Sequence, residues 1–251
     1  VYAFALLLAV FILGLTGGAA VASHWLIGSR RPALRLAVTI GIAAISSAIL
    51  IPLFHFLPSW SASAIREATG FWSIQLSNML LAAILMLPTT LALGATFPIA
   101  LEAATRQGVQ IAPAIGQLGA ANTLGAVIGS LASGVFLLPA IGLQSTLAVT
   151  ITLLLAAGTL LTFSGERPVR VTIPVSLLAA LLAAGIWFLP PWPVVSLTVA
   201  PFLHRNRTAH MHVAEPKQMK TLFYRDGVCS SVAVKESNNG ERIIFLGGKP
   251  D

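Results

Sequence analysis

The sequence predicts a mainly α protein: a polytopic transmembrane helical bundle of about six helices, followed by a short antiparallel β segment of a truncated soluble domain. Hydrophobic residues make up 56% of the 251 residues and charged residues only 9%, which is too apolar for a soluble domain of this length. Of the 23 charged residues, 10 precede His204 and 13 follow it. Because the chain opens on Val1 and stops at Asp251 just after a turn signal, we expect it to be a piece of a longer protein.

Long uncharged runs predict the helices, since a helix needs about 20 apolar residues to cross the hydrocarbon layer and an ionised side chain there is costly. The runs show no period-2 alternation, so helices are expected rather than a barrel. Six spans are predicted, at residues 1–27, 34–57, 71–101, 115–138, 143–163 and 171–189.

The connections are short and rich in Gly, Pro and charge, as in "GSRRPALR" and "SGERPVR", which predicts a compact bundle. Three segments are therefore expected: a transmembrane helical domain at 1–189, a linker at 190–218, and the start of a β-domain at 219–251. The helix of the last span is expected to end at the prolines between Pro190 and Pro193.

One predicted helix carries a face of small side chains four residues apart: Ala121, Gly125, Gly129 and Ser133. Small residues let a neighbouring helix approach closely, so we expect a helix–helix contact there, with a substrate path as the alternative. The same kind of face is the expected route to a homo-oligomer. Gln117 and Asn122 lie in or near this span, and each is expected to hydrogen-bond to a neighbouring helix.

Charges near the spans are few. Glu102 and Arg106 are four residues apart at the end of the third span and predict a local ion pair. No span has a charged residue at its centre, which counts against a proton-coupled transporter. Arginines in the first loop favour a cytoplasmic first loop, and six spans would then place the tail outside. Arg205 and Arg207, which follow the last span, instead favour a tail on the cytoplasmic side. The orientation of the tail stays open.

The formal net charge of +7 is expected to reflect basic loops at a membrane, so no nucleic-acid partner is predicted. The single cysteine, Cys229, excludes an internal disulfide and a multi-cysteine metal site. His204, His210 and His212 form a weak metal signal without a carboxylate at suitable spacing, and a solvated basic stretch near lipid headgroups is preferred. No catalytic, cofactor-binding or metal-binding residue is assigned.

The last thirty residues predict strands. A first strand leads into a turn at Asp226-Gly227, and the residues from Val228 to Lys235 then alternate in polarity. Asn239-Gly240 is a favoured hairpin turn, after which a strand from Arg242 to Leu246 is expected. The segment is thus a small antiparallel sheet with one apolar face, which needs further strands or a covering domain to be stable.

Two stretches resemble a known family. The tail "LFYRDGVCSSVAVKE…GERIIFLGGKPD" resembles the N-terminal β-domain of spermidine synthase-like proteins, the polyamine aminopropyltransferases. The apolar stretches "LALGATFPIALEAA" and "GQLGAANTLGAVIGSLASGVFLLPAIGL", with "YAFALLLAVFILGLTGGAA", resemble the multi-spanning domain fused ahead of that module in bacterial membrane-bound members. The run at residues 120–126 is the most specific part of this resemblance.

The resemblance implies an aminopropyl transfer from decarboxylated S-adenosylmethionine, the expected co-substrate, to a diamine such as putrescine. It also implies that the full-length protein is an integral protein of the bacterial inner (plasma) membrane, with the lipid bilayer and a polyamine substrate as partners. An acidic side chain would position and deprotonate the attacking amine. That residue and the nucleotide site are expected after residue 251, so the chain itself is expected to have no cofactor and no catalytic activity.

The chain departs from the soluble synthases at two places. Ser231 stands where they commonly carry a glutamine for the nucleoside, and Leu246-Gly247-Gly248 stands where they read Leu-Asp-Gly. We interpret Ser231 as a solvent-facing strand residue. The alternative functions are a membrane transporter or export module of major-facilitator type with a regulatory soluble tail, because six helices match half of such a bundle, and a membrane scaffold without catalysis.

Overall fold

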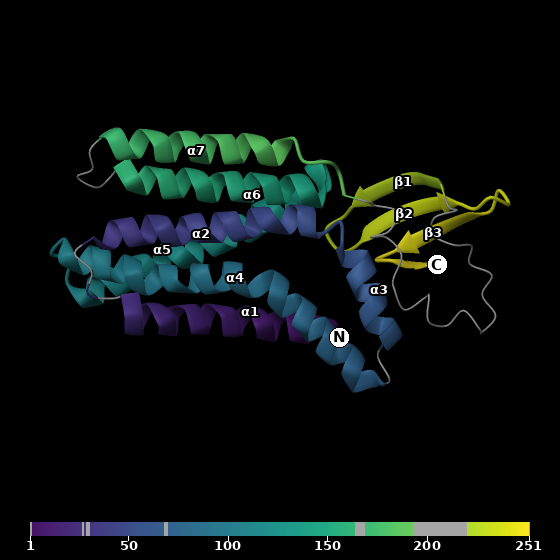
Figure 1. Cartoon of the computed structure of the whole chain (residues 1–251), viewed down its shortest axis with the longest axis horizontal. Helices are drawn as coiled ribbons and strands as arrows, with labels where there is room; N and C mark the ends of the chain where they lie inside the picture. Colours follow the sequence, from purple (N-terminus) through teal and green to yellow (C-terminus); the bar gives the residue numbers. More distant parts are fainter. Residues whose placement is uncertain are drawn as a thin grey trace. The chain divides into compact units, whose positions relative to one another are not determined.

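The structure is a computed structural model that describes residues 2–26, 28, 31–67, 70–163, 169–192 and 220–250. The described chain is mainly helical, with one small sheet near its C-terminal end (Figure 1). It divides into two compact units. The first comprises residues 1–50, 79–129 and 147–189, and the second comprises residues 51–78, 130–146 and 190–251.

All of the described helices except α3 coincide with the predicted uncharged runs. Two of the α-helices continue directly into short π-helical segments. In chain order they are α1 (Tyr2–Val21) with π-segment η1 (Ala22–Leu26), α2 (Pro32–Leu53), α3 (Leu57–Glu67), α4 (Phe71–Arg106), α5 (Ile111–Leu131) with π-segment η2 (Ala132–Leu137), α6 (Leu138–Phe163) and α7 (Val169–Trp187).

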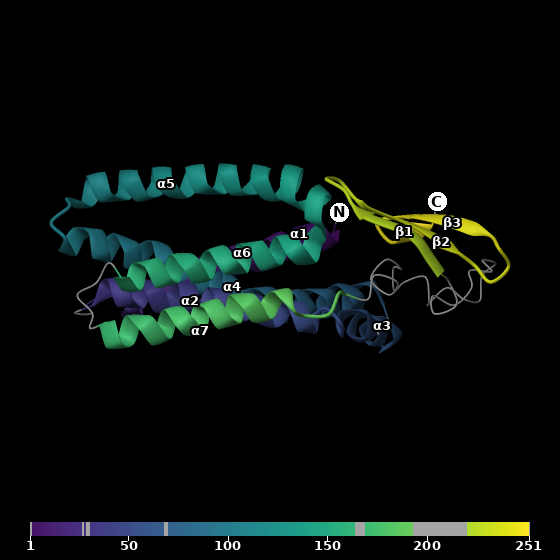
Figure 2. The ribbon, with the colours of Figure 1, turned by 90° about the horizontal axis from the view of Figure 1, so that it is seen from above.

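Four described helical runs are long and apolar enough to cross a membrane: Phe4–Trp25, Pro32–Leu53, Phe71–Arg106 and Ile111–Phe163. The last run has 53 residues and reverses direction near Gly142, whose φ of 78° interrupts the helix within α6 (Figure 2). The apolar part of α7, Thr172–Trp187, is shorter than these four runs. A helix therefore coincides with each of the six predicted spans, while four runs satisfy the length and composition of a crossing.

Helix α3 was not predicted. Its sequence "LPSWSASAIRE" mixes apolar with polar and charged residues, so a search for long uncharged runs passes over it. It follows a short turn after α2, and the Trp60 ring stacks on Phe56 at a centroid distance of 6.0 Å. Both rings are exposed, as is typical of aromatic side chains at a membrane–water interface.

Within the first unit, α1 and α4 pack closely through glycine. A Cβ at Gly18 would overlap the carbonyl group of Leu91, and a Cβ at Gly94 would overlap the carbonyl group of Leu15. The two helices therefore meet backbone to backbone, as small residues allow in membrane helices. This contact also excludes any larger side chain at Gly14, where a Cβ would overlap Thr90.

The same unit has a small buried centre at the far end of α1. Ala22, Ala95 and Ile99 are buried together, and Leu36 of α2 packs against them. Polar groups also join α2 to α4: the Ser46 hydroxyl lies 3.0 Å from the Thr89 hydroxyl. Packing and a hydroxyl pair thus hold α2 against α4, which carries prolines at positions 88 and 98.

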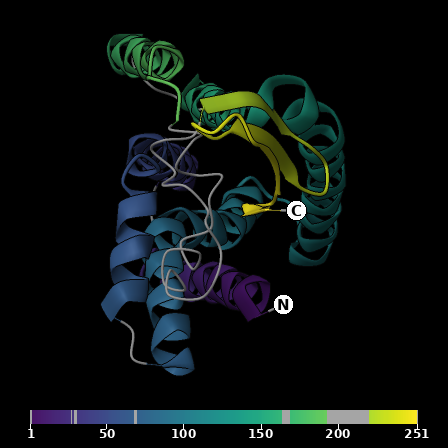
Figure 3. The same cartoon turned by 90° about the vertical axis from the view of Figure 1, so that its right-hand side faces the viewer.

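The second unit contains a four-stranded antiparallel sheet of order β1-β2-β3-β4. Figure 3 shows this sheet in yellow-green and yellow. The strands are β1 (Lys220–Asp226), β2 (Ser231–Glu236), β3 (Arg242–Leu246) and β4 (Lys249–Pro250). The turn at Gly240, with φ of 79°, and the hairpin at Gly247 and Gly248, with φ of 55° and 85°, use backbone conformations that favour glycine. The predicted antiparallel sheet is confirmed, but β2 begins at Ser231 rather than at Val228.

The face that the sheet buries includes a charged residue. Ala233 and Phe245 are opposite each other on β2 and β3, and both are about 1% exposed. Lys235, two residues after Ala233, points to the same side and is fully buried. The sheet therefore buries one lysine among its apolar side chains.

Candidate functional site

Asp226, at the end of β1, joins the sheet to helix α6. One oxygen of its carboxylate, Oδ1, accepts a hydrogen bond from the Tyr224 hydroxyl, and the other, Oδ2, accepts one from the Leu143 backbone N–H at 3.0 Å. Leu143 follows the break at Gly142, so its N–H belongs to the first turn of the helix that continues to Phe163. The first N–H groups of a helix have no partner within it, and a carboxylate is favoured there by the helix dipole. Asp226 thus acts as a cap supplied by a distant strand.

The tyrosine next to Asp226 is held in its neutral form. Burial raises the pKa of Tyr224 well above its usual value, and the hydrogen bond to Asp226 and the negative charge of that carboxylate raise it further. A neutral phenol is the state that can donate the hydrogen bond. The Tyr224–Asp226 pair is therefore structural, and both carboxylate oxygens already have a donor, which leaves Asp226 poorly placed to act as a general base.

Lys235 lies on the buried face of the sheet. Its Nζ atom is 5.0 Å from the centroid of the Phe245 ring, which is within the range of a cation–π contact. Burial lowers the pKa of Lys235 to about 8, because the charged ammonium is poorly solvated there. At neutral pH the ammonium is mostly charged and lies against an aromatic face.

A second cluster ties the residues after α7 to α2 and α6. The Gln144 side chain donates to the carbonyl of Pro190 at 3.0 Å and accepts from the N–H of Trp192 at 2.9 Å. The Trp192 indole N–H donates to the carbonyl of Ile51 at 2.7 Å, in the last turn of α2, and its ring stacks on Phe54 at 4.4 Å. The carbonyls of a last helical turn lack partners within the helix, so Trp192 satisfies one of them.

The predicted ion pair at the end of the third span is confirmed. Arg106 and Glu102 are 2.9 Å apart, and Glu102 also accepts a hydrogen bond at 2.9 Å from the N–H of Gly28. The glutamate is 8% exposed. Glu102 therefore connects the end of α4 to the turn between α1 and α2, which sequence spacing did not indicate.

The predicted contact on the small-residue face of α5 is wrong for the chain as described. Ala121, Gly125 and Gly129 are exposed, and a Cβ at either glycine would meet no atom within 4 Å. Helix α5 lies at the outer edge of the helices in Figure 2, in agreement with this exposure. Close glycine packing occurs instead between α1 and α4.

The remaining predicted positions are not brought together. Gln117 and Asn122 are exposed on α5, and Cys229 is exposed and unpaired in the β1–β2 turn. Ser231 is half-buried at the start of β2, opposite Asp226. His204, His210 and His212 lie outside the described residues, and within the described ranges no three His, Cys, Asp or Glu side chains gather as metal ligands would.

Sequence reasoning missed the roles of Asp226 and Gln144. Asp226-Gly227 was interpreted only as a turn, and Gln144 lies just inside a predicted span without a periodic pattern around it. Their partners are 83 and 46 to 48 residues away in sequence. The one available signal was that both are polar residues at the boundary of an apolar segment.

Comparisons with protein-family models, with curated proteins and with solved structures find no match to this chain.

Proposed function

We propose that this chain is the membrane-anchoring part and the first sheet of a spermidine synthase-like aminopropyltransferase. The complete protein would transfer an aminopropyl group from decarboxylated S-adenosylmethionine to a diamine such as putrescine. In this proposal, catalysis belongs to a nucleotide-binding domain that follows the sheet, and the helices hold that domain at the bacterial inner membrane.

The observation that carries the proposal is the sheet itself. The residues that resemble the synthase β-domain, from Leu222 to Pro250, fold as consecutive antiparallel strands with the Tyr224-Arg225-Asp226-Gly227 run at the end of β1. They follow helices long and apolar enough to cross a membrane, which is the order expected of a membrane-bound member. The resemblance of residues and this order of parts together favour the synthase reading over a plain scaffold.

The contacts of Asp226 and Trp192 fit an anchoring role for the helices. Asp226 binds the sheet to the first turn of the second segment of α6, and Trp192 binds the residues after α7 to the end of α2. Both contacts are hydrogen bonds to helix ends, and the one made by Asp226 attaches the sheet itself.

The proposal is tested with the complete gene product, expressed in bacterial membranes and purified in a mild detergent. Transfer of a labelled aminopropyl group from decarboxylated S-adenosylmethionine to putrescine, and to longer diamines, is measured. The chain of 251 residues, purified in the same way, is the matched control and should give no transfer. Binding of methylthioadenosine to the complete protein, measured by calorimetry, gives a second readout. Folded complete protein that transfers to no diamine and binds no adenosyl nucleotide would exclude the proposed enzyme.

A further inference from the structure

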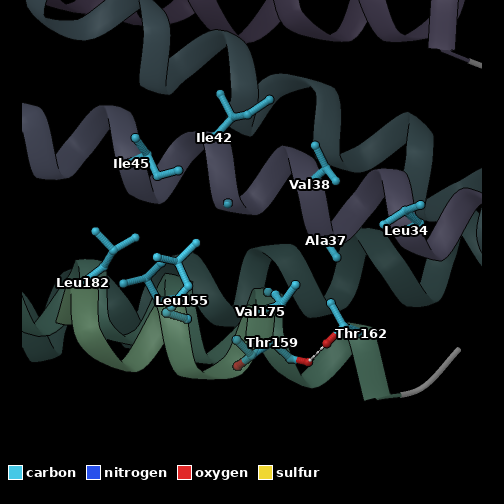
Figure 4. Close-up of a pocket in the computed structure, with 14 residues that line it drawn as sticks. Leu34, Ala37, Val38, Ile42, Ile45, Leu155, Thr159, Thr162, Val175 and Leu182 are labelled. Carbon is cyan, nitrogen blue, oxygen red and sulfur yellow. Dashed lines mark hydrogen bonds between the residues drawn. The ribbon is translucent and has the colours of Figure 1, made fainter. Parts of the chain in front are cut away.

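An apolar groove runs along the first unit between α2, α6 and α7 (Figure 4). Its volume is about 370 Å³, which lies within the range of about 300–1,000 Å³ for small-molecule pockets. Leu34 and Thr162 lie at one end of the groove, and Ile45 and Leu182 lie at the other. All of its lining residues belong to helices that match predicted spans.

The walls of the groove offer almost no polar atoms. The lining side chains are aliphatic except for two threonines, Thr159 and Thr162. The hydroxyl of each donates to a carbonyl of its own helix, that of Ala156 at 2.8 Å and that of Thr159 at 2.7 Å. Because these hydroxyl protons are already bound, the groove suits an elongated apolar group rather than a polar solute.

The end of the groove at Leu34 coincides with the start of α2, where an arginine follows Leu34. Arg35 is the next residue on α2 and is half-buried, and its Nη1 atom is enclosed without a hydrogen-bond acceptor. Within the described part of the chain, Arg35 has no carboxylate within ion-pair distance, and Glu102 of α4 is bound to Arg106. Arg31 directly precedes α2, so two arginines lie at the start of this helix. No charged residue lies among the groove residues at the Ile45 end.

An occupant that matches both features has an apolar chain and an anionic head. The start of α2 adds the positive end of a helix dipole to the charge of Arg35. Basic sites between membrane helices are typical binding sites for anionic lipid headgroups. We infer that the groove binds one acyl chain of an anionic phospholipid, with the phosphate at Arg35. A zwitterionic lipid carries an additional ammonium group, which the arginine repels, so it binds more weakly.

Native mass spectrometry of the full chain in a mild detergent tests this inference, with equal amounts of phosphatidylglycerol and phosphatidylcholine added. The wild-type chain should retain phosphatidylglycerol several-fold more often. Arg35→Gln should lower that preference about fivefold, the effect expected of one arginine near an anionic lipid surface. Arg242→Gln, on the exposed strand β3, removes the same charge outside the groove and should leave the preference unchanged.

Filling the groove tests the site of the acyl chain. Gly41 lines the groove and a Cβ there would meet no atom within 4 Å, so Gly41→Leu should place a side chain in the groove and reduce binding of both lipids. Gly185→Leu, on the exposed side of α7, has equal free space and does not line the groove, which makes it the matched control. Val38→Phe fills the groove from an exposed position and replaces Gly41→Leu if that variant does not fold.

Three results would overturn the inference. Equal retention of the two lipids by the wild-type chain would exclude an anionic site, and unchanged lipid binding in both groove-filling variants would exclude this groove. A change of oligomeric state in those variants, with lipid binding intact, would instead identify the groove as an interface between two copies of the chain.

Discussion

Glycine 18 provides the sharpest test of how the helices pack. In Gly18→Ala, the added Cβ would lie 2.8 Å from the carbonyl carbon and 2.9 Å from the Cα of Leu91, and closer still to the carbonyl oxygen. Such an obstacle is main chain and cannot rotate away, so α1 and α4 must separate. Overpacking costs about 1–3 kcal/mol, and the higher helix propensity of alanine returns at most about 1 kcal/mol. We therefore expect a net loss of about 1–2 kcal/mol.

Two other glycines make this a graded series. At Gly17 the added Cβ lies 3.2 Å from the Leu91 Cδ2 atom, the end of a side chain that can move, so Gly17→Ala should be nearly neutral. At Gly185 nothing lies within 4 Å, and Gly185→Ala should stabilise slightly through helix propensity. Unfolding of the full chain by increasing SDS in mixed micelles, followed by circular dichroism, ranks the three variants. If Gly18→Ala is as stable as Gly185→Ala, the close α1–α4 contact is not present in the protein.

Four further predictions concern the sheet and its attachment. Asp226→Ala should destabilise the sheet by about 1–2 kcal/mol, because the bond between the sheet and the first turn of the second α6 segment is lost. Arg225→Gln, at the exposed neighbouring residue, should have no such effect. Both variants are followed by urea unfolding, with a dye attached to the single, exposed Cys229. In the same assay the sheet should gain stability as the pH rises from about 8 to 10, since the unfolded chain holds the Lys235 proton that the folded chain has lost, and Lys235→Met should remove this rise. Above about pH 10 the wild-type sheet should lose stability, because the raised pKa of Tyr224 means that the folded chain keeps a phenol proton that the unfolded chain releases. The same loss of stability in Tyr224→Phe would contradict this explanation. Gln144→Leu should destabilise the full chain by about 1–2 kcal/mol in the SDS assay, because the Trp192 N–H and the Pro190 carbonyl lose their hydrogen-bond partner. Gln117→Leu, at an exposed position on α5, is the control and should have no effect.

The sequence by itself determined where most of the helices and strands lie. Backbone groups in an apolar run must pair within their own segment, so an uncharged run of sufficient length can only be a helix, and α1, α2, α4 and the run from α5 to α6 lie where such runs predict them. Turn residues fixed the hairpin at Gly240 in the same local way. The ion pair of Glu102 with Arg106 was predictable because both residues lie one turn apart on one helix. The short helix α3 was missed because mixed polarity over eleven residues gives no such signal.

Only the tertiary structure decided which surfaces meet. Small residues occur on both α1 and α5, yet the glycines of α1 and α4 pack backbone to backbone, whereas a Cβ added at Gly125 or Gly129 of α5 would meet no described atom within 4 Å. Likewise, the sequence shows Asp226 only as a turn residue, and its bond to Leu143 arises because the fold brings two segments 83 residues apart into contact. The pattern of apolar residues along a segment indicates its secondary structure, which is formed by hydrogen bonds within that segment or with the neighbouring strand. Contacts between segments depend on the matched shapes of two surfaces and on which helix ends lack partners, and these properties exist only once the chain has folded.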